Sequence, residues 1–451
     1  MKKINKSQQP TKQFFKKLPN KLRFVVLSSF GKISGGGHLN RTKKLANLLK
    51  SYFLSPKKSI QKYLKPNKSS PKSHLNSNPK KIHFTFLNSE NLHNQKQAKH
   101  KKTSWQNPKI FTHIVRESSF VIIDSYKATR KHFKILLNKS SKKCNILILN
   151  DGVEFLDFIL EIVATKITQH KHIAKALQRI IILNGGLGSE YLLCEVKNKI
   201  HNLSSDLGGT LLRYFVENNV FYGGQYFLAN TDFIYKRAKQ RVRIKHILIT
   251  FGASDYLNAT QQTTNALNEI FKNLEGNLEC IFEARVCLHI VLGEFYPHKF
   301  MPTFSANLMQ NNISSPTSKL TYKIYNNLKP QDFALLMSKC DIAISASGQS
   351  LYEIALNTLP FITIPTANNQ LPQSKAFAKS GGGIVLNNVA FVPNATHKNN
   401  ADFTRKLANA LRNGLTCFTQ KSRYAMSQNL AKLNIGKSSH KIATRFLQNR
   451  A

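Results

Sequence analysis

The sequence predicts an α/β protein with two Rossmann-like domains that face a cleft. Short, continuous apolar runs alternate with helical stretches, which is typical of a parallel sheet covered by helices on both faces. This rhythm occurs twice, starting near residue 22 and again near residue 245 of the 451-residue chain. Small-residue loops follow several of the runs, and open parallel sheets bind ligands outside the carboxyl ends of their strands. We therefore expect two successive domains, each with a ligand-binding edge.

The domain boundaries follow from changes in composition. Residues 1–21 predict a basic, disordered arm, and residues 436–451 predict a basic C-terminal tail. The N-terminal domain then spans 22–228, a linker spans 229–243, and the C-terminal domain spans 244–435. Stretches 57–81 and 95–102 are polar and basic with little apolar periodicity, so we expect two inserted loops. The expected strands cover 22–28, 82–87, 120–124, 145–150 and 180–184 in the first domain, and 245–250, 289–292, 341–345 and 360–365 in the second.

Cysteine content and hydropathy predict a cytoplasmic protein. The six cysteines include no pair at C-x-x-C spacing, which favours a reducing compartment and indicates no metal framework. No apolar run approaches the length that spans a bilayer, and the first residues do not form a secretory signal. We find neither a His/Cys ligand cluster nor a D-x-D at a strand end, so the sequence predicts no metal and no cofactor.

The formal net charge of +45 raises nucleic-acid or anionic-membrane binding as a function. Glu90 is the only acidic residue before Glu117, so part of the excess reflects scarce acidic residues. A generally basic chain explains the charge at least as well as a specific polyanion partner does. The sequence contains no zinc finger, aromatic RNA-binding strand motif or basic heptad helix. We expect no specific nucleic-acid partner, weak association with anionic membranes, and a monomer.

The first candidate catalytic loop follows the first strand. Gly35, Gly36 and Gly37 allow a ligand to approach the backbone at a helix start. The adjacent His38, with Arg41 one turn further on, can accept a proton near neutral pH and so could activate a water. A glycine turn before a helix is common, however, and a histidine there is more often a surface residue or a cap.

The second candidate loop follows the strand at 120–124. Asp124 and Tyr126 place a carboxylate and a phenol where they could fix sugar hydroxyls or orient His38. The alternative is a turn or helix-capping aspartate beside a packed tyrosine, and the two residues alone favour it.

Three loops of the second domain carry candidate binding residues. Small residues at Gly252 and Ser254 permit approach of a phosphate, although Asp255 alternatively caps the next helix. The amides of Asn369 and Gln370 can donate and accept hydrogen bonds to a sugar, although a polar connecting loop is the simpler interpretation.

The loop after the strand at 341–345 is the most informative of these. Ser347, Gly348 and Ser350 lead into a helix whose first N–H groups would hold a diphosphate, and Glu353 would accept from ribose hydroxyls. Ser350 and Glu353 also have the spacing of a capping box, which needs no ligand. The two interpretations are equally supported by this motif alone.

Taken in order, these loops resemble a known family. The motifs G-x-G-H…R, D-S-Y, (N/D)-D, G-x-x-Y, G-x-S-D…N-x-T, S-A-x-G-x-S-x-x-E and N-Q run from Ser34 to Gln370. Their order resembles the sugar-nucleotide hydrolases of pseudaminic acid biosynthesis, which act on UDP-2,4-diacetamido-2,4,6-trideoxy-β-L-altropyranose. That family belongs to the glycosyltransferase-B superfamily, which includes the peptidoglycan N-acetylglucosaminyltransferase MurG. The resemblance covers most of the chain outside the basic ends and polar insertions.

The resemblance implies roles for individual residues. His38 matches the proposed general base, Tyr126 and Asn369 match residues at the sugar, and Glu353 matches the glutamate that holds the uridine ribose. The full substrate-binding set that we expect is Gly37, Arg41, Asp124, Tyr126, Asn369 and Gln370, and the UDP-binding set is Gly252, Ser254, Ser347, Gly348, Ser350 and Glu353.

Several positions depart from the family pattern. Asn150 and Asp151 stand where two aspartates are usual, and residues 229–233 lack the usual arginine before an acidic residue. Ser347 and Gln349 stand where glycine and serine are usual, and Ala253 replaces a glycine. The proposed base is retained, whereas the diphosphate contacts differ in detail.

The implied reaction is a metal-independent hydrolysis with inversion at the sugar. A water deprotonated by His38 would attack the anomeric carbon, and helix N-termini of the second domain would stabilise the departing UDP. Two alternatives stay open. One is a MurG-like glycosyltransferase that passes the sugar to an acceptor, and the other is a non-catalytic protein that binds a sugar nucleotide or a polyanion.

Overall fold

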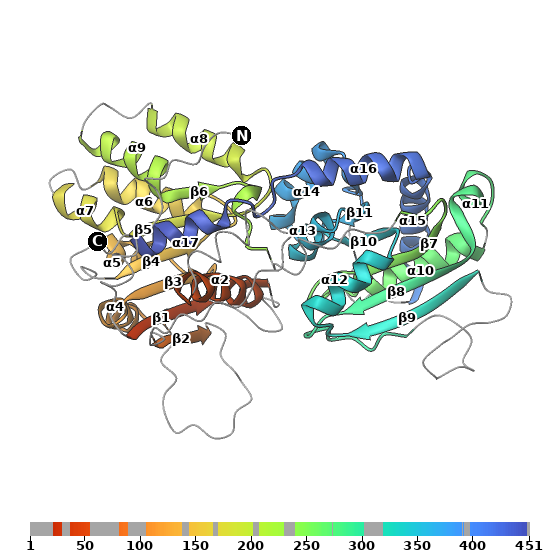
Figure 1. Ribbon diagram of the computed structural model, residues 1–451, viewed down its shortest axis with the longest axis horizontal. Coiled ribbons are helices and arrows are strands. Elements are labelled where there is room, and N and C mark those ends of the chain that lie inside the picture. The colour runs from red at the N-terminus through yellow and green to blue at the C-terminus, as the bar shows by residue number, and fades with distance from the viewer. Residues whose placement is uncertain are drawn as a thin grey trace, which may run out of the picture. The chain divides into compact units, whose positions relative to one another are not determined.

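The chain folds as two compact units in a computed structural model (Figure 1). Unit 1 contains the described residues of 21–34, 38–228 and 436–448, and unit 2 contains Gly37 and the described residues of 229–435. The structure describes residues 21–28, 37–54, 81–88, 105–137, 144–165, 170–201, 207–229, 240–272, 274–301, 319–389, 391 and 397–448. The predicted arm at 1–20, the linker at 230–239, and the insertions at 57–80 and 95–102 lie outside these ranges.

Unit 1 is built on a parallel six-stranded sheet in the order β2-β1-β3-β4-β5-β6. The chain reverses its direction of winding between β1 and β3, which makes this pair the topological switch point of the sheet. The strands are β1 (Lys21–Ser28), β2 (Lys81–Asn88), β3 (Phe120–Asp124), β4 (Asn145–Leu149), β5 (Ile180–Asn184) and β6 (Val220–Tyr222).

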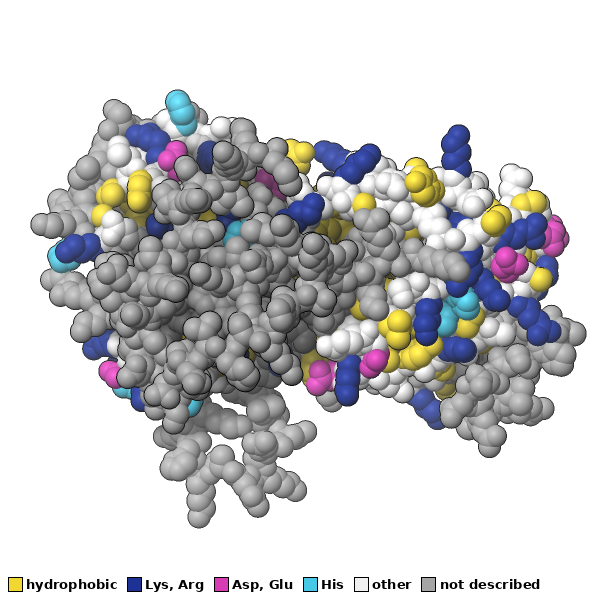
Figure 2. All heavy atoms as spheres, viewed as in Figure 1, with side chains coloured by type: hydrophobic (Ala, Val, Ile, Leu, Met, Phe, Trp, Pro, Cys, Tyr) yellow, Lys and Arg dark blue, Asp and Glu magenta, His cyan; other side chains and the backbone are white. Residues whose placement is uncertain are grey.

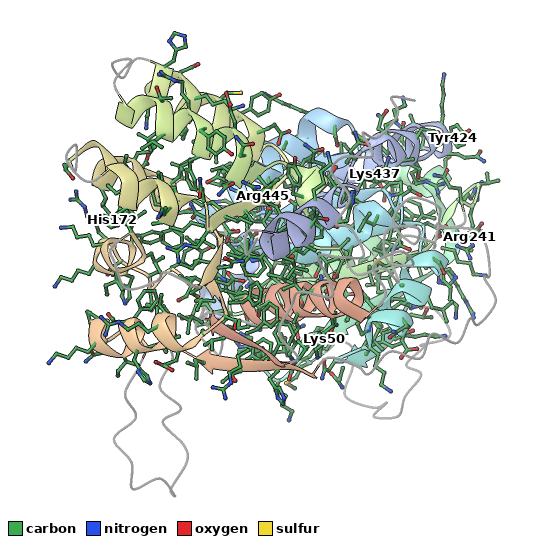
Figure 3. The ribbon with its side chains drawn as sticks, turned by 60° about the vertical axis from the view of Figure 1, so that its left-hand side comes forward. Lys50, His172, Arg241, Tyr424, Lys437 and Arg445 are labelled. Atoms are coloured by element: carbon green, nitrogen blue, oxygen red, sulfur yellow. The ribbon has the colours of Figure 1, made fainter. Side chains whose placement is uncertain are left out.

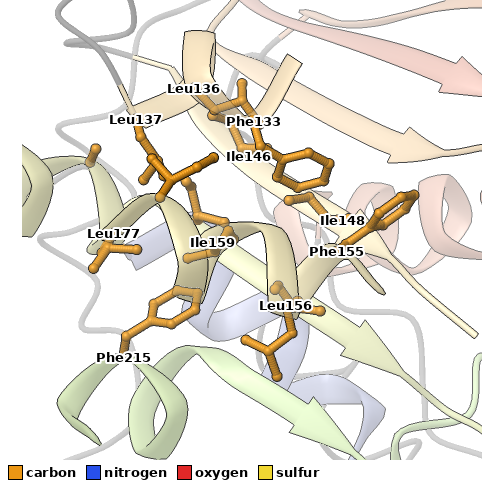
Figure 4. Packing of buried hydrophobic residues seen from close by; sticks show 14 of the residues in the cluster. Phe133, Leu136, Leu137, Ile146, Ile148, Phe155, Leu156, Ile159, Leu177 and Phe215 are labelled. Atoms are coloured by element: carbon orange, nitrogen blue, oxygen red, sulfur yellow. The ribbon is translucent and has the colours of Figure 1, made fainter. Parts of the chain in front are cut away.

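Helices cover both faces of this sheet, as continuous apolar strands require. On β3, Val121 and Ile123 face one core and Phe120 and Ile122 face the other. The first core, part of which Figure 4 shows, includes residues of α4 (Pro108–Glu117), α5 (Arg130–Leu137), α6 (Glu154–Ala164), α7 (His170–Leu177), α8 (Ser189–His201) and α9 (Leu207–Asn219). The second core contains the predicted apolar face of α2 (Gly37–Leu54), with Leu45, Leu48 and Leu49 buried.

The predicted C-terminal tail is instead a helix of unit 1, α17 (Ser439–Gln448). Ile442, Ala443, Phe446 and Leu447 are buried against β1, β3 and β4 in the same core as α2. The Asn145 amide donates to the Phe446 carbonyl at 3.0 Å, and Arg445, labelled in Figure 3, donates to Asn219 at 2.8 Å. Apolar residues at helical spacing outweigh the basic composition, because burying them is favourable whereas lysines remain solvated on the opposite face.

Unit 2 is built on a second parallel six-stranded sheet, in the order β12-β11-β10-β7-β8-β9. Renumbered from β7, this is the 3-2-1-4-5-6 order of a Rossmann fold, with its switch point between β7 and β10. The strands are β7 (Ile244–Thr250), β8 (Phe282–Leu292), β9 (Leu320–Asn326), β10 (Ile342–Ala346), β11 (Phe361–Ile364) and β12 (Gly383–Val385). The two units therefore have the predicted α/β class, and each is built on a Rossmann-like parallel sheet.

The helices of unit 2 are α10 (Ala259–Lys272), α11 (Asn277–Ile281), α12 (Pro330–Lys339), α13 (Gln349–Leu356), α14 (Leu371–Ser380), α15 (His397–Thr416) and α16 (Gln420–Lys432). Alternate residues of β7 and β8 pack against α10, α11 and α15 in one core. Sequence analysis missed β6, β9 and β12. β6 and β12 are only three residues long, and the edge strand β9 carries Thr321 and Lys323 among its apolar residues.

Lysine and arginine side chains are spread over the described surface and do not gather on one element of the face shown in Figure 2.

Among the described residues, no helix combines the length and the apolar character needed to cross a bilayer.

Candidate functional site

The candidate site lies at the switch point of the unit 1 sheet, where polar side chains follow neighbouring strands. His38 is the second residue of α2, the helix that follows β1, and Asp124 is the last residue of β3. Ser28 at the end of β1 is the register partner of Asp124. Asp151 follows the end of β4, so three strand ends contribute to one cluster. Gly37 begins α2, and Gly35 and Gly36 lie outside the described residues.

His38 and Asp124 form the centre of the cluster. Nδ1 of His38 lies 2.6 Å from Oδ1 of Asp124, and the Asp124 side chain is completely buried. Arg41 donates from Nε to Oδ2 of Asp124 at 3.0 Å and from Nη2 to Oδ1 at 2.5 Å. Because Asp124 receives the imidazole and a two-pronged guanidinium contact together, the histidine ring is held in one orientation.

Asp151 extends the cluster toward the surface. It accepts from Nη1 of Arg41 and, at 2.5 Å, from the hydroxyl of Tyr126. The Tyr126 ring stands edge-on to the His38 imidazole, with 4.9 Å between ring centroids. Tyr126 is 55% exposed, so it is not the packed tyrosine of the alternative interpretation, and its ring is accessible beside His38.

The charges of the cluster stabilise one another. Burial alone would raise the pKa of Asp124, but Arg41 and then His38 outweigh it and lower that pKa. Burial would also raise the pKa of Asp151, but Arg41 lowers it. The pKa of Arg41, which burial would lower, is raised well above its usual range by the two carboxylates. Both carboxylates and the guanidinium are therefore charged at neutral pH.

This arrangement suits proton transfer through His38. With the proton of Nδ1 directed at Asp124, Nε2 is the ring nitrogen that can accept a proton from a water. The carboxylate also stabilises the imidazolium that forms. Asp151 was named in a sequence motif but was not among the predicted site residues, and its position directly after β4 is the signal that identifies it.

The loop after β7 in unit 2 contains two residues that leave room for a ligand and one that caps a helix. Gly252 has φ of +88°, which disfavours any larger residue, and a Cβ there would meet no atom within 4 Å. Ser254 is half-buried beside it. Asp255 caps α10, because its carboxylate accepts from the backbone N–H groups of Ala259 at 2.7 Å and Thr260 at 2.8 Å.

The loop after β10 leaves a helix N-terminus without a side-chain cap. Helix α13 begins at Gln349 with Gly348 as its N-cap, so Ser350 lies inside the helix and the capping-box interpretation is wrong. Ser350 and Glu353 are half-buried. The Ser347 side chain is fully buried, and its hydroxyl lies 2.9 Å from that of Thr363, so the predicted UDP-binding role of Ser347 can rest only on its backbone.

In the loop after β11, the side-chain amides of Asn369 and Gln370 have different surroundings. Asn369 is exposed, whereas Gln370 binds its own loop: Oε1 accepts from Thr366 N at 2.9 Å and Nε2 donates to Thr366 Oγ1 at 3.1 Å. The predicted sugar-binding role of Gln370 therefore competes with a structural one. The same loop contains the 3₁₀ turn Asn368–Gln370.

The prediction of no His/Cys ligand cluster is wrong. His246, Cys287 and His289 could together hold a metal ion, since one ligand atom from each lies within 4.8 Å of the others. About forty residues separate His246 from the other two in sequence, so no local motif reveals them. Parallel pairing of β7 with β8 brings them together.

The fold and the strand-end cluster define the class: a two-unit Rossmann-like α/β protein with a carboxylate-oriented histidine. No family model matches the chain. In sequence, 273 residues are 29% identical to a Helicobacter pylori protein named pseudaminic acid cytidylyltransferase and UDP-2,4-diacetamido-2,4,6-trideoxy-beta-L-altropyranose hydrolase. The match covers 60% of this chain and spans only 38% of the length of that relative.

Solved structures with weak overall similarity to this chain include the following three proteins. Acinetobacter baumannii MurG is 11% identical with a TM-score of 0.41, covering 90% of this chain and 95% of its own. A putative UDP-N-acetylglucosamine 2-epimerase from Listeria monocytogenes is 10% identical with a TM-score of 0.41, covering 93% and 94%. Arabidopsis thaliana UGT89C1 complexed with UDP-L-rhamnose is 9% identical with a TM-score of 0.45, covering 94% and 99%.

Proposed function

We propose that this protein hydrolyses a UDP-linked 2,4-diacetamido-2,4,6-trideoxy-L-altrose, releasing UDP and the free sugar. The observation that carries the proposal is the 2.6 Å contact between His38 Nδ1 and buried Asp124, at the switch point of a parallel sheet. The sequence similarity to the Helicobacter pylori protein, whose name includes this hydrolase activity, supports the choice of substrate.

His38 is the proposed general base. Nε2 takes a proton from a water as the water oxygen forms a bond to the anomeric carbon. The bond between that carbon and the β-phosphate oxygen breaks, and its electron pair leaves with UDP. Attack from the face opposite the leaving group inverts the anomeric configuration. The imidazolium then returns its proton to solvent.

Asp124 and Arg41 act as positioning residues for this step. Asp124 fixes the tautomer of His38, and Arg41 keeps Asp124 ionised by lowering its pKa against the effect of burial. Arg41 is fixed in turn by Asp151, which also accepts from Tyr126. The hydroxyl of Tyr126 is thereby oriented, and its exposed ring forms a surface for the sugar beside the base.

The loops of unit 2 are proposed to bind the UDP part of the substrate. The open space at Gly252 permits close approach of a phosphate to the backbone, and the first N–H groups of α13 carry partial positive charge. Gly348 at the N-cap contributes no side chain to block that end of the helix. Glu353, Ser350 and Ser254 are half-buried candidates for further contacts, and Asn369 is an exposed candidate for the sugar.

We also propose that the protein works in pseudaminic acid biosynthesis in the cytoplasm. All six cysteines are free thiols, as a reducing compartment allows.

A proton NMR time course with the UDP-linked diacetamido sugar and no acceptor tests the proposal directly. We expect UDP and free sugar to appear in equal amounts, with the first-formed sugar inverted at the anomeric carbon. His38→Gln is the decisive variant, because glutamine can still donate to Asp124 but cannot accept a proton as a base. His172→Gln is its matched control, since His172 is an exposed histidine on α7 (Figure 3).

We expect His38→Gln to lower turnover about 10²- to 10⁴-fold and His172→Gln to retain it. UDP release that persists unchanged in His38→Gln would remove His38 from the mechanism. If folded wild-type protein releases UDP only when an acceptor is supplied, the protein is a glycosyltransferase and the hydrolase proposal fails.

A further inference from the structure

A second polar cluster lies within the unit 2 sheet, before the carboxyl ends of its strands. His246 is the third residue of β7, and Cys287 and His289 are alternate residues of β8. His246 is the register partner of Cys287, and Leu248 is the partner of His289. Because paired residues of parallel strands and alternate residues of one strand share a face, all three side chains project from the same side of the sheet.

The ligand atoms of this group converge. Nδ1 of His246 lies 3.0 Å from Nε2 of His289, and Sγ of Cys287 lies within 4.8 Å of both. In tetrahedral zinc sites, Zn–N bonds of about 2.0–2.1 Å and Zn–S bonds of about 2.3 Å place ligand atoms about 3.3–3.6 Å apart. Small side-chain shifts would therefore bring the three atoms into the geometry of one bound ion.

The contact between the two imidazoles requires a shared hydrogen. Two ring nitrogens 3.0 Å apart are stable only when one of them carries a proton directed at the other. A metal ion can take the place of that proton, because it bonds both lone pairs at once. The pair is thus arranged so that metal binding replaces a single hydrogen bond.

Tyr325 of β9 orients the second histidine. Its hydroxyl lies 3.1 Å from Nδ1 of His289, on the opposite side of the ring from Nε2. Metal-binding histidines almost always have such a partner on the other ring nitrogen, which fixes the tautomer and raises the basicity of the ligand. His289 is buried, whereas His246 is partly exposed and leaves a route for an ion.

From this geometry we propose that His246, Cys287 and His289 bind a thiophilic transition-metal ion of the Zn²⁺ class. Two imidazoles and a thiolate suit Zn²⁺ or Co²⁺, whereas Mg²⁺ and Ca²⁺ prefer oxygen ligands. Three protein ligands leave the fourth position for a water. The ion would join β7 to β8 as a structural clamp, and the inference does not depend on the hydrolase proposal.

The surrounding charges narrow the choice of ion further. Arg241, Lys323 and Lys339 all interact with His289 electrostatically, and Asp341 is a negative group facing His246. This positive surrounding disfavours a cation held by charge alone. It favours an ion that forms strong bonds to nitrogen and sulfur, because such bonds outweigh the repulsion between the ion and these positive groups.

Co²⁺ is the probe that distinguishes this site from surface histidines. Untagged, chelator-treated full-length protein is titrated with Co²⁺ and followed by absorption. We expect one equivalent to bind, with the thiolate-to-Co²⁺ charge-transfer band and the strong visible bands of tetrahedral cobalt. Zn²⁺ should then displace Co²⁺ and remove these bands.

Two sets of variants locate the site. Cys287→Ala should lose the charge-transfer band, whereas a protein with its three exposed cysteines replaced together (Cys194→Ser, Cys280→Ser and Cys417→Ser) should keep it. Tyr325→Phe should weaken Zn²⁺ affinity about tenfold, because partners of metal-binding histidines contribute 10- to 100-fold. Circular dichroism of each variant confirms that it is folded.

Co²⁺ binding without a thiolate band would overturn the proposal, as would a band that survives in Cys287→Ala. A band lost only in the exposed-cysteine variant would place the ion on the surface and also overturn it. If Cys287→Ala does not fold, Cys287→Ser provides the same measurement with a smaller change of side chain.

Discussion

The two histidine clusters of this protein differ in position and in charge. The cluster of His38, Asp124, Arg41, Asp151 and Tyr126 occupies the strand ends of unit 1, where the sheet changes its winding direction. The cluster of His246, Cys287 and His289 lies along the middle of two strands in unit 2.

Charge separates the clusters as clearly as position. In the unit 1 cluster, Arg41, Asp124 and Asp151 are ionised, because their opposite charges outweigh the effect of burial on their pKa values. The unit 2 cluster consists of residues that are neutral when burial dominates, and burial is the main reason that the pKa of His289 falls to about 4. The comparison shows that His38 is a candidate base because it contacts a carboxylate at a strand end. His246 and His289 are candidate metal ligands because the atoms that converge with theirs are those of another imidazole and a thiol.

The largest effect expected from this comparison is a separation of functions between the clusters. His38→Gln should lower kcat about 10²- to 10⁴-fold, the usual contribution of a general base, and leave Co²⁺ binding unchanged. Cys287→Ala should do the reverse, with kcat within about twofold of wild type and the Co²⁺ band lost. Steady-state UDP release and cobalt absorption on the same preparations provide both measurements. If either variant loses both properties while folded, the clusters are not independent.

Asp124→Asn should have the next largest effect. A hydrogen bond to a charged group contributes about 1.5–3 kcal/mol, so losing the carboxylate should lower kcat about 10- to 150-fold. The variant should also lose about 3 kcal/mol of unfolding free energy or less, because Arg41 loses one of two partners in a buried pair. Asp402→Asn is the matched control. It breaks the exposed Arg405–Asp402 pair and should cost about 0.5 kcal/mol or less in urea unfolding.

Arg41→Met should reverse the direction of the Asp124 pKa shift. Without the guanidinium, burial dominates, and we expect that pKa to rise above its ordinary value of about 3.9. Carbon NMR of labelled aspartate measures it. Asp255 in unit 2 serves as an internal reference, since burial already raises its pKa to about 6 and Arg41→Met should not change it. An Asp124 pKa that stays low in the variant would contradict the assigned cause.

The pKa shifts of Asp124 and Asp255 make the free energy of unfolding depend on pH in opposite directions. The stabilisation from ionised Asp124 is present above about pH 3.9 and is lost as the pH falls through its lowered folded pKa. Asp255 has a folded pKa above its unfolded value, so its contribution is present below about pH 3.9 and is lost as the pH rises through about 6.

Tyr126→Phe should have the smallest effect. It removes one hydrogen bond to Asp151, worth about 0.5–1.5 kcal/mol, and keeps the ring beside His38. We therefore expect kcat to fall about two- to tenfold and the Asp151 pKa to rise, because the hydroxyl contributes to lowering it. A loss as large as that of His38→Gln would instead give the phenol a direct part in the chemistry.

Much of this architecture could be predicted from sequence because buried parallel strands produce recognisable apolar runs. Runs such as Phe120–Asp124 and Asn145–Leu149 are buried at every position, so each contains four consecutive apolar residues, and a polar residue ends or directly follows each run. The loops after them could be recognised as candidate sites, including His38 and Asp124. Sequence analysis could predict that Asp124 orients His38, because the ends of neighbouring strands meet at the switch point of a parallel sheet.

The remaining features depend on contacts that sequence spacing does not encode. Ser347 and Gln370 have suitable side chains for a ligand, but both hydroxyl and amide find partners within the protein. His246 and Cys287 are paired only because β7 and β8 adopt one register. Helix α17 was predicted to be a basic tail because of its lysines and arginines, although Ile442, Ala443 and Phe446 have the spacing of a buried helix face.

Helix α17 also sets the order in which the protein can be completed during synthesis. Unit 1 begins the chain, yet part of the core behind β1 and β3 is supplied by Phe446 and its neighbours at residues 439–448. A ribosome must therefore produce all of unit 2 before that core can close. The strands that position His38 and Asp124 therefore gain part of their support from residues that are translated after all of unit 2.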